Sequence, residues 1–393
     1  MNVLIAPDKF KGCLSAAEVA RAIARGVRNA APDAVIDCIA LADGGEGIVD
    51  ALVESSAGTL HTANVSGPLG QSVEATYGLL GDGTTAVLEM AAASGLVLVP
   101  HDLRDPLRAT TRGTGELLLH AVRGGARRVI LGIGGSATND GGAGLAQALG
   151  FRLLDVRGAE LGPGGGPLSD LDRIVPPDHP PLGDAEILVA CDVTNPLCGP
   201  QGASAIYGPQ KGATPAMVAQ LDASLEHFAA IIRRDLGVDI RDLPGAGAAG
   251  GLGAGLVAFA GGSLSPGIEI VLKTLGVSAK MERADLCLTG EGSVDHSSAY
   301  GKTVAGVGAL AASLGVPAIA LAGTIGPGYE RLHERGIVAI FPIAPGPITL
   351  QESLARAPEL LEAAAESLMR LVVGFASGPK SHLEIRNRNQ EDL

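Results

Sequence analysis

Tryptophan is absent from this chain of 393 residues, and aromatic side chains make up only 3% of it. Glycine is abundant instead, with 57 residues, so tight turns and sites lined by backbone groups are expected. Apolar residues account for 46% of the chain and recur throughout it, which argues against a disordered protein and allows a large core. The length favours two domains over one.

Cysteine is also scarce, with five residues at positions 13, 38, 191, 198 and 287. No Cys-x-x-Cys pair and no cysteine–histidine zinc pattern occurs, so free thiols in a reducing cytoplasm are expected. No apolar run reaches the length of a membrane span, and the chain starts directly with the strand-like residues 3–6. We therefore expect a cytoplasmic protein with no signal peptide and no membrane contact.

Positive charge is in deficit, and the formal net charge is −13. No stripe of lysine and arginine is visible, so a nucleic-acid partner is not expected. A net negative protein can still bind a nucleotide, because Mg²⁺ and local donors handle the phosphates.

Both ends of the chain alternate strand-like and helical patterns. A strand at residues 2–7 is followed by an S-x-x-E capping box at Ser15 and Glu18, a helix to about Arg28 and a strand at residues 34–41. Near the other end, strands and helices alternate at residues 285–289, 304–314, 316–322, 329–335, 338–343 and 350–372. This alternation predicts an α/β fold with a parallel sheet covered by helices on both faces.

The middle of the chain reads as a mixed α/β region inserted into that sheet domain. We predict a first, discontinuous domain at residues 1–62, 108–150 and 284–373, and a second at residues 63–107 and 151–283. Residues 374–393 are polar and carry little periodicity, so a mobile tail is predicted there.

Two loops near the start of the chain combine glycine with charge after a predicted strand, where open α/β sheets bind ligands. Lys9 and Lys11 precede a helix N-terminus and suit a phosphate group, although a solvated turn is the simpler alternative. Asp43 follows the next strand, beside two glycines and Glu46. Its carboxylate suits Mg²⁺ or a catalytic base, and the alternative is a turn whose Glu46 favours the next helix dipole.

The densest glycine loop covers residues 132–142. The N–H groups of its glycines can form an anion nest, to which hydroxyl and amide side chains add neutral donors. The candidate ligand-binding residues in this loop are Gly134, Gly135, Ser136, Thr138 and Asn139.

A fourth loop, at residues 289–303, adds Glu291 and Asp295 between glycines and ends in Lys302. Its last three residues resemble the end of a Walker A loop, but His296 stands where that motif needs glycine, so the match fails. Gly290 and Gly292 flank Glu291, and a phosphate or metal role is the hypothesis for this loop.

Asp192 follows the strand at residues 187–190 and is a candidate general base, with an Asx turn as the alternative. Residues 245–250 match G-x-G-x-x-G literally, but no strand precedes them. Gly132, Gly134 and Ala137 match its relaxed form, but Asp140 and two glycines interrupt the helix that should follow. The G-x-S-x-G hydrolase motif is missing.

Together and in this order, the loops resemble the bacterial type I glycerate kinase family over about residues 1–372. The matching segments are residues 6–12, 42–47, 134–142, 191–197, 265–269, 290–295 and 301–302. The resemblance implies two α/β domains, one flavodoxin-like with permuted topology, and phosphoryl transfer from ATP to D-glycerate in the cleft between them, usually giving 2-phosphoglycerate. The chain departs from many relatives at His296-Ser297-Ser298, where they carry Gln followed by Ser or Thr, and at Cys13, where Ser is common.

The resemblance also implies which residues reach the cleft, and their roles are our hypotheses. Mg²⁺ is assigned to Asp43, Glu291 and Asp295, charge neutralisation to Lys9, Lys11 and Lys302, and proton acceptance to Asp192. Cofactor binding is assigned to the glycine loop (Gly134, Gly135, Ser136, Thr138, Asn139) with Gly290 and Gly292. Residues 136–139 or a lysine are also candidate donors to the glycerate carboxylate, so which loop binds ATP and which binds the acid is left open. The partners are ATP and D-glycerate, and a monomer or homodimer is expected. The alternatives are a kinase for another small hydroxy or sugar acid, a nucleotide-dependent oxidoreductase and an anion-binding protein without catalysis.

Overall fold

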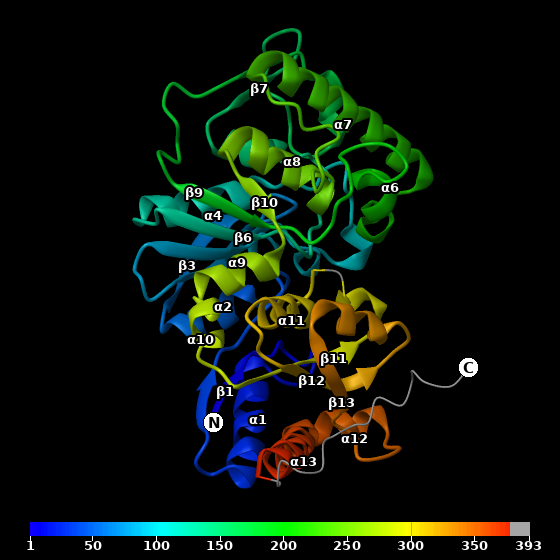
Figure 1. Ribbon diagram of the computed structural model, residues 1–393. Helices are drawn as coiled ribbons and strands as arrows, with labels where there is room; N and C mark the ends of the chain where they lie inside the picture. Colours follow the sequence, from blue (N-terminus) through cyan, green and yellow to red (C-terminus); the bar gives the residue numbers. More distant parts are fainter. Residues whose placement is uncertain (300, 378–393) are drawn as a thin grey trace, which may run out of the picture.

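Two β-sheets organise the chain, as the computed structural model shows (Figure 1). The structure describes residues 1–299 and 301–377. The first sheet has the strand order β13-β12-β11-β1-β2, and all its strands are parallel. Its strands are β1 (Asn2–Ile5), β2 (Val35–Cys38), β11 (Leu286–Val294), β12 (Ala318–Ile325) and β13 (Ile337–Pro342).

Numbered along the chain, the strands of this sheet run 2-1-3-4-5, which is the flavodoxin-like order. No permutation is needed to reach this order, because the second sheet is simply inserted between β2 and β11. The permutation implied by the family resemblance is therefore not seen in the strand order.

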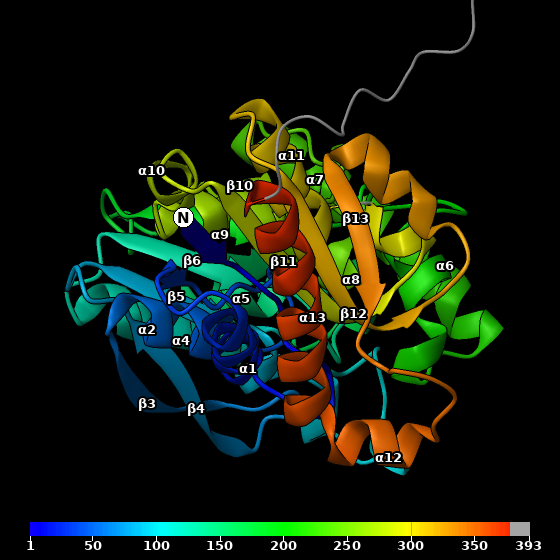
Figure 2. The ribbon, with the colours of Figure 1, turned by 60° about the horizontal axis from the view of Figure 1, so that its bottom comes forward.

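Helices cover both faces of the first sheet, as predicted. On one face lie α1 (Ala16–Ala30) and α13 (Ala357–Ser377), side by side in Figure 2. A Cβ built on Gly26 would lie 2.2 Å from the Glu362 carbonyl oxygen, so the absence of a side chain lets these two helices approach closely. The predicted capping box is confirmed: the N–H of Ser15 donates to Glu18 Oε2 at 2.8 Å, and the N–H of Glu18 donates to Ser15 Oγ at 3.3 Å.

The second sheet is mixed and six-stranded, in the order β10-β9-β6-β5-β4-β3. The first four strands in that order are parallel, and β4 and β3 are antiparallel additions. These strands are β3 (Thr59–Ser66), β4 (Ser72–Leu79), β5 (Thr85–Glu89), β6 (Arg128–Gly132), β9 (Glu186–Ala190) and β10 (Ser263–Ser265). A short hairpin joins β7 (Arg152–Leu154) and β8 (Arg173–Val175).

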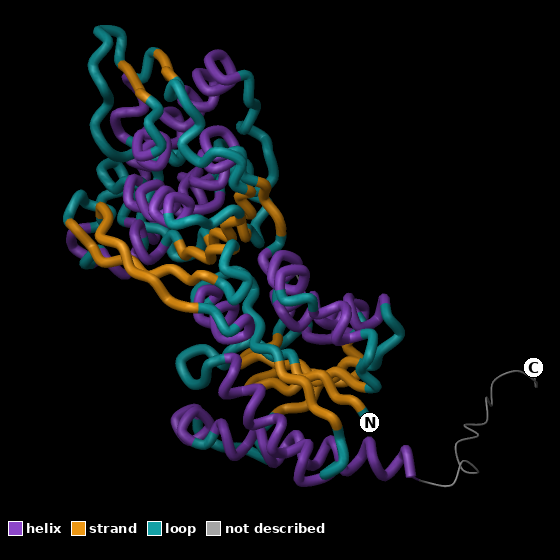
Figure 3. Tube along the Cα trace, turned by 90° about the vertical axis from the view of Figure 1, so that its left-hand side faces the viewer, coloured by secondary structure: helices purple, strands orange, loops and turns teal. Residues whose placement is uncertain are grey.

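Side chains on the second sheet alternate between two cores. Leu88 and Leu131 face an outer core, while Val87 and Ile130 face a middle core that also holds Leu4 of the first sheet. The helices of this middle layer are α2 (Ile48–Ser56), α9 (Gly267–Thr274), α10 (Val277–Met281) and α11 (Thr303–Ser313). Figure 3 shows the two strand layers with helices between and outside them.

The outer core lies under the helices of the second sheet. These are α3 (Ala91–Ser94), α4 (Arg112–Arg123), α5 (Ala143–Ala148), α6 (Ala203–Tyr207), α7 (Pro215–Leu236) and α8 (Ala248–Ala260). The 3₁₀ helices are η1 (Leu96–Leu98), η2 (His101–Leu103), η3 (Gly166–Asp170), η4 (Pro209–Lys211), η5 (His296–Ala299) and η6 (Tyr329–Arg335). Within the described ranges, no helix is long and apolar enough to cross a membrane.

Three details differ from the sequence predictions. Residues 108–150 were assigned to the first domain, but they contain α4, β6 and α5, and β6 pairs with β5 and β9 of the second sheet. The helix predicted at 350–372 is divided into α12 (Leu350–Ala355) and α13 at Arg356, whose φ is −108°. Helix α13 runs to Ser377, four residues into the predicted tail, and residues 378–393 lie outside the described residues.

The two crossings between the sheets touch each other. Residues 39–47 lead into α2, and residues 266–285 return to β11. A Cβ built on Gly267 would lie 2.0 Å from the Asp43 carbonyl oxygen, and one on Gly44 would lie 2.7 Å from Gly267 Cα. Gly44 also has a φ of +95°, a conformation that side chains disfavour. Glycine at both positions therefore lets the Asp43 loop pack against the start of α9.

Candidate active site

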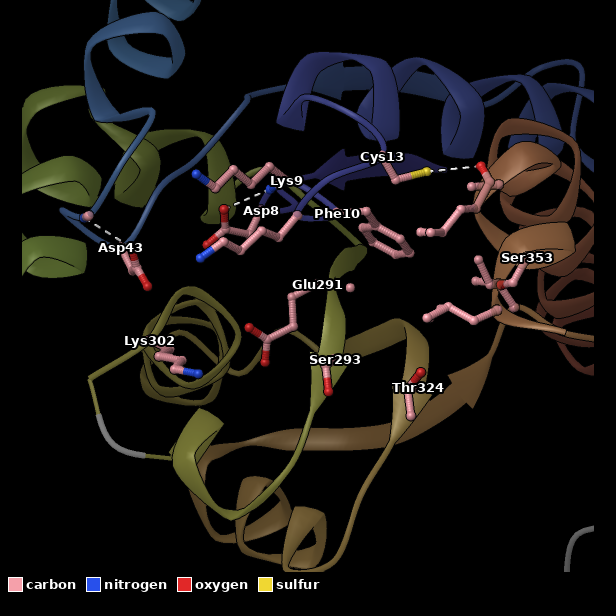
Figure 4. Close-up of a pocket in the computed structure, with 18 of the residues that line it drawn as sticks. Asp8, Lys9, Phe10, Cys13, Asp43, Glu291, Ser293, Lys302, Thr324 and Ser353 are labelled. Atoms are coloured by element: carbon pink, nitrogen blue, oxygen red, sulfur yellow. Dashed lines mark hydrogen bonds between the residues drawn. The ribbon is translucent and has the colours of Figure 1, made fainter. Parts of the chain in front are cut away.

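A cavity of ≈ 510 Å³ opens at the carboxyl ends of β1, β11 and β12 (Figure 4). The charged residues in its wall are Asp8, Lys9, Lys11, Asp43, Glu46, Glu291 and Lys302. The sequence analysis expected all of these except Asp8 and Glu46 in the cleft, and the structure brings them together from four separate segments of the chain. Parallel strands end at the same edge of a sheet, which explains why loops distant in sequence converge here.

Three of the four acidic residues in this wall, Asp8, Asp43 and Glu291, form an acidic cluster. Glu291 is only 8% exposed, and burial, with Asp8 and Asp43 as negative neighbours, raises its pKa to about 7. Burial likewise raises the pKa of Asp8 to about 6, although the Thr303 hydroxyl donates a hydrogen bond to it. Asp43 Oδ1 accepts the N–H of Gly45 at 3.0 Å, which holds this side chain in place.

This acidic cluster fits a divalent cation. Glu291 Oε1 is buried and has no hydrogen-bond partner among residues 1–299 and 301–377, so its electron pairs are available to a cation. Within the same ranges, no group of three or more His, Cys, Asp or Glu side chains is arranged to hold a metal ion. Magnesium usually takes one or two carboxylates together with phosphate oxygens and water, and a partial set of carboxylates suits it.

Three lysines supply the positive charge. Lys9 Nζ donates to the Glu46 carbonyl oxygen, Lys302 Nζ donates to Ser297 Oγ at 2.9 Å, and the Lys11 side chain is exposed at the cavity wall. Lysine side chains bind phosphate groups as point charges, so this set suits a phosphorylated ligand.

Asp295 is not among the described residues that line this cavity, but hydrogen bonds through Ser297 connect it to Lys302, which does line it. Asp295 Oδ1 accepts the N–H of Ser297 at 2.7 Å and its hydroxyl at 2.6 Å, and these bonds lower the pKa of Asp295. The Ser297 hydroxyl in turn accepts from Lys302. Asp295, predicted as a metal ligand, is therefore placed to orient Lys302. Ser297, the first serine of the unusual His296-Ser297-Ser298 segment, makes both hydrogen bonds.

A second cavity of ≈ 220 Å³ lies at the carboxyl ends of β6 and β9. Gly134, Gly135 and Ser136 of the glycine loop line it together with Asp192. The Asp192 residue is exposed at the edge of this cavity. Partial loss of solvation around its carboxyl group, together with the charge of Asp43, raises its pKa to about 6. The N–H of Gly267 donates to Asp192 Oδ1 at 2.9 Å, which leaves Oδ2 for other partners.

The rest of the glycine loop is buried beneath this cavity. Thr138 and Asn139 are 0% exposed, so direct contact with a ligand, as predicted from the sequence, is closed to them in this structure. The Thr138 carbonyl accepts from the buried Lys211 Nζ at 2.6 Å, and Asn139 Nδ2 donates to Ser204 Oγ at 2.9 Å. Asp140, also buried, accepts the N–H of Gly142, Gly144 and Thr111 at 2.8–3.2 Å. These contacts fix the backbone whose glycines face the cavity.

Of the other glycines in the predicted loops, Gly290 and Gly250 allow close packing of the backbone, and Gly292 lines a cavity. Gly292 lines the larger cavity, whereas Gly290 is buried, and a Cβ there would lie 2.3 Å from the Leu321 carbonyl oxygen. Gly250, the last glycine of the literal G-x-G-x-x-G run, would bring a Cβ within 2.0 Å of the Thr138 carbonyl oxygen. That run therefore supports the glycine loop from below, and the strand that a dinucleotide site needs does not precede it.

Sequence reasoning left Asp8 and Thr303 without a role, although Asp8 stands inside a matching segment and Thr303 directly follows one. The sequence indicated them only through their neighbours Lys9 and Lys302: Asp8 lies three residues after β1, and Thr303 opens α11. Their contact across 295 positions of sequence could not be read from either segment alone.

Gly267 contacts both the Asp43 loop and Asp192, so a substitution there tests whether their positions matter for activity. Gly267→Ala is expected to lower kcat about 100-fold, because the new Cβ must displace the Asp43 loop and the N–H that holds Asp192. Steady-state kinetics on the purified variant would measure this. Gly374→Ala on α13 is the control, since among the described residues nothing lies within 4 Å of a Cβ there. A Gly267→Ala enzyme with a kcat within twofold of the unchanged protein would contradict the proposed role of this contact.

Lysines and carboxylates gathered at the carboxyl ends of parallel strands define an α/β enzyme site suited to phosphate chemistry. The sequence model of the glycerate kinase family matches residues 3–373. A glycerate kinase of Halalkalibacterium halodurans is 50% identical over 368 residues, covering 93% of this chain and 97% of that protein. A glycerate 2-kinase of Escherichia coli is 50% identical over 354 residues, covering 90% and 93%.

A crystal structure from Salmonella typhimurium LT2 is also similar, with a TM-score of 0.87 and 47% identity over 96% of this chain and 100% of that one. The chain belongs to the glycerate kinase family and is a kinase. The α/β fold with a parallel sheet covered on both sides agrees with the sequence prediction.

Proposed function

We propose that this protein transfers the γ-phosphoryl group of ATP to the 2-hydroxyl of D-glycerate, giving 2-phospho-D-glycerate and ADP. The observation that carries the proposal is the convergence of Asp8, Asp43 and Glu291 with Lys9, Lys11 and Lys302 around one cavity. Its substrate follows from the names of the relatives, one of which is a glycerate 2-kinase with 50% identity. Five free thiols, all within the described ranges, fit a reducing cytoplasm.

In this proposal Asp192 accepts the proton of the attacking hydroxyl. The hydroxyl oxygen bonds to the γ-phosphorus, the bond from that phosphorus to the β–γ bridging oxygen breaks, and ADP carries away the electron pair. Its raised pKa of about 6 keeps Asp192 mostly ionised at neutral pH while making it a stronger base than an ordinary aspartate. Lys9, Lys11 and Lys302 would offset the negative charge on the phosphates.

Asp43 and Glu291, with Asp8 beside them, would hold a magnesium ion. Such an ion, when bound, neutralises charge on the nucleotide phosphates. The unpartnered Glu291 Oε1 supports this assignment for the described part of the chain. Asp295 takes the role of orienting Lys302 through Ser297, in place of the metal ligation first assigned to it.

An assay for ADP release tests the proposal directly. The purified protein, mixed with MgATP and D-glycerate, is expected to release ADP at a rate well above that with MgATP alone. Phosphorus NMR of the product should give the resonance of 2-phosphoglycerate, and that of 3-phosphoglycerate would correct the regiochemistry. ADP release with other small hydroxy acids but none with D-glycerate would overturn the substrate while leaving the kinase class intact.

A further inference from the structure

The large cavity has two chemically different ends. One end holds the carboxylates and lysines described above, on the side of Asp8 and Lys302 in Figure 4. The opposite end, around Phe10, Thr324 and Ser353, is mainly apolar. Its apolar side chains, here called the apolar wall, are Phe10, Ile343, Leu350 and Leu354.

Two members of the apolar wall are unusual for their exposure. Leu350 and Leu354 lie on the short helix α12 and are 71% and 41% exposed, although they border a cavity. Exposed apolar side chains in a concave site beside a few polar groups are typical of a ligand surface. Thr324 and Ser353 supply hydroxyl groups at the same end.

The apolar wall is tied to the loop that carries two of the lysines. The Cys13 thiol donates a hydrogen bond to the Leu354 carbonyl oxygen at 3.1 Å, which joins α12 to the segment after Lys9 and Lys11. A ligand lying along this cavity would therefore contact apolar side chains at one end and charged groups suited to phosphate at the other. A nucleoside triphosphate has that chemistry, and a three-carbon acid has only the polar half.

The volumes of the two cavities also favour a nucleotide in the first and a small acid in the second. The larger one, at ≈ 510 Å³, falls within the range of about 300–1,000 Å³ typical of sites for larger organic ligands. The smaller one, at ≈ 220 Å³, falls below that range. It offers the backbone of Gly134 and Gly135 with the side chains of Ser136 and Gln210, donors suited to a small carboxylate.

The two cavities meet beside the candidate base. Gly45 lines both of them. A Cβ built on Gly301 would lie 3.8 Å from Asp192 Oδ1, so the segment that ends in Lys302 adjoins Asp192 from the side of the larger cavity. A phosphate group leaving one cavity and a hydroxyl entering from the other would come together at this junction.

We propose that the nucleotide lies in the larger cavity with its base on the apolar wall, and that the hydroxy acid lies in the smaller cavity against the glycine loop. This assignment rests on the proposed function, because it takes ATP and a small acid as the two substrates. Of the two ligands that the sequence left open for Gly134, Gly135 and Ser136, it selects the acid. Phosphoryl transfer then takes place at Gly45.

A pair of variants tests the assignment by its two separate readouts. Leu354→Asp is expected to raise the Kd for ADP about 10- to 100-fold, because it places a charge against the base, while the KM for D-glycerate changes little. Gln210→Met removes an amide from the smaller cavity with little change in shape. It is expected to raise the KM for D-glycerate about 10-fold and to leave the Kd for ADP unchanged. ADP binding is measured by calorimetry without the acid, and KM by ADP release.

The controls separate the possible failures. Leu371→Asp places the same charge on an exposed leucine of α13, 51% exposed and outside both cavities, and should bind ADP like the unchanged protein. Leu350→Asp repeats the test if Leu354→Asp fails to fold by circular dichroism. Unaltered ADP binding in the folded wall variant would overturn the assignment and leave the proposed function standing. No ADP binding by the unchanged protein, with magnesium present, would overturn both.

Discussion

Asp192→Asn is expected to lower kcat about 100- to 10,000-fold, the usual contribution of a general base, while the Kd for ADP stays within about twofold. The amide keeps the size of the side chain and can still accept the N–H of Gly267, which lies 2.9 Å from Asp192 Oδ1. It cannot accept the proton of the attacking hydroxyl. Steady-state kinetics with saturating MgATP and D-glycerate, together with calorimetric titration of ADP, measure the two effects separately.

Asp184 provides a matched control for Asp192. It lies two residues before β9, at the opposite end of the strand that Asp192 follows, and it is also exposed. Asp184→Asn should retain kcat within about twofold, because it lies far along the strand from both cavities. If Asp192→Asn turned over at a rate close to that of Asp184→Asn, Asp192 could not be the base, and the proton would have to leave by another route.

Glu291→Gln is expected to make the protein more stable at pH 8 and to abolish most of its phosphoryl transfer. The pKa of Glu291 rises from 4.5 to about 7 on folding, so the folded state binds more protons than the unfolded state between those values. Stability therefore falls as the pH rises through that window, and above pH 7 the ionised Glu291 costs up to about 3 kcal/mol. Glutamine is neutral at every pH and avoids this cost.

Urea unfolding of both proteins at pH 4.5 and pH 8, with EDTA present, checks the sign. The variant should gain up to about 3 kcal/mol over the unchanged protein at pH 8 and little at pH 4.5, where Glu291 is protonated in the folded state. Glu282→Gln, at an exposed position before β11, is the control and should shift stability little at either pH. A Glu291→Gln protein less stable than the unchanged one at pH 8 would mean that the carboxylate is compensated by contacts other than a cation.

Gains in stability from such a change are expected where a carboxylate is buried without full compensation of its charge. Asp8, Asp43 and Glu291 are held close together with raised pKa values at Asp8 and Glu291, which is unfavourable for the folded protein without a cation. Exposed or paired carboxylates such as Asp155 and Asp235 show the opposite pattern, because hydrogen bonds lower the pKa of each. Burial also raises the pKa of Asp140 beneath the glycine loop, so what distinguishes the cluster is the cavity it faces and, among the described residues, the unpartnered Glu291 Oε1.

The sequence predicted local features of the chain better than it predicted which strands pair with each other. The capping box at Ser15 and the strands at both ends of the chain agree with the structure. Lys9, Lys11, Asp43, Glu291 and Lys302 line one cavity, and their roles stay predictions. The assignment of residues 108–150 to the first sheet differs from it, because apolar periodicity identifies a buried strand without saying which neighbour it pairs with. Only the register of β6 against β5 and β9 decides that.

By itself, the sequence determined which backbone groups and charges this protein has available, since glycine loops and carboxylates at strand ends are properties of short segments. Their order along the chain also determined the family. The tertiary structure decided which of them share a cavity. It buried Thr138 and Asn139, turned Asp295 toward Ser297, and brought Asp8 to Thr303. The burial of Thr138 and Asn139 and the contact of Asp8 with Thr303 depend on packing between segments 65 to 295 positions apart. Burial sets both the access of a ligand and the pKa of each carboxylate.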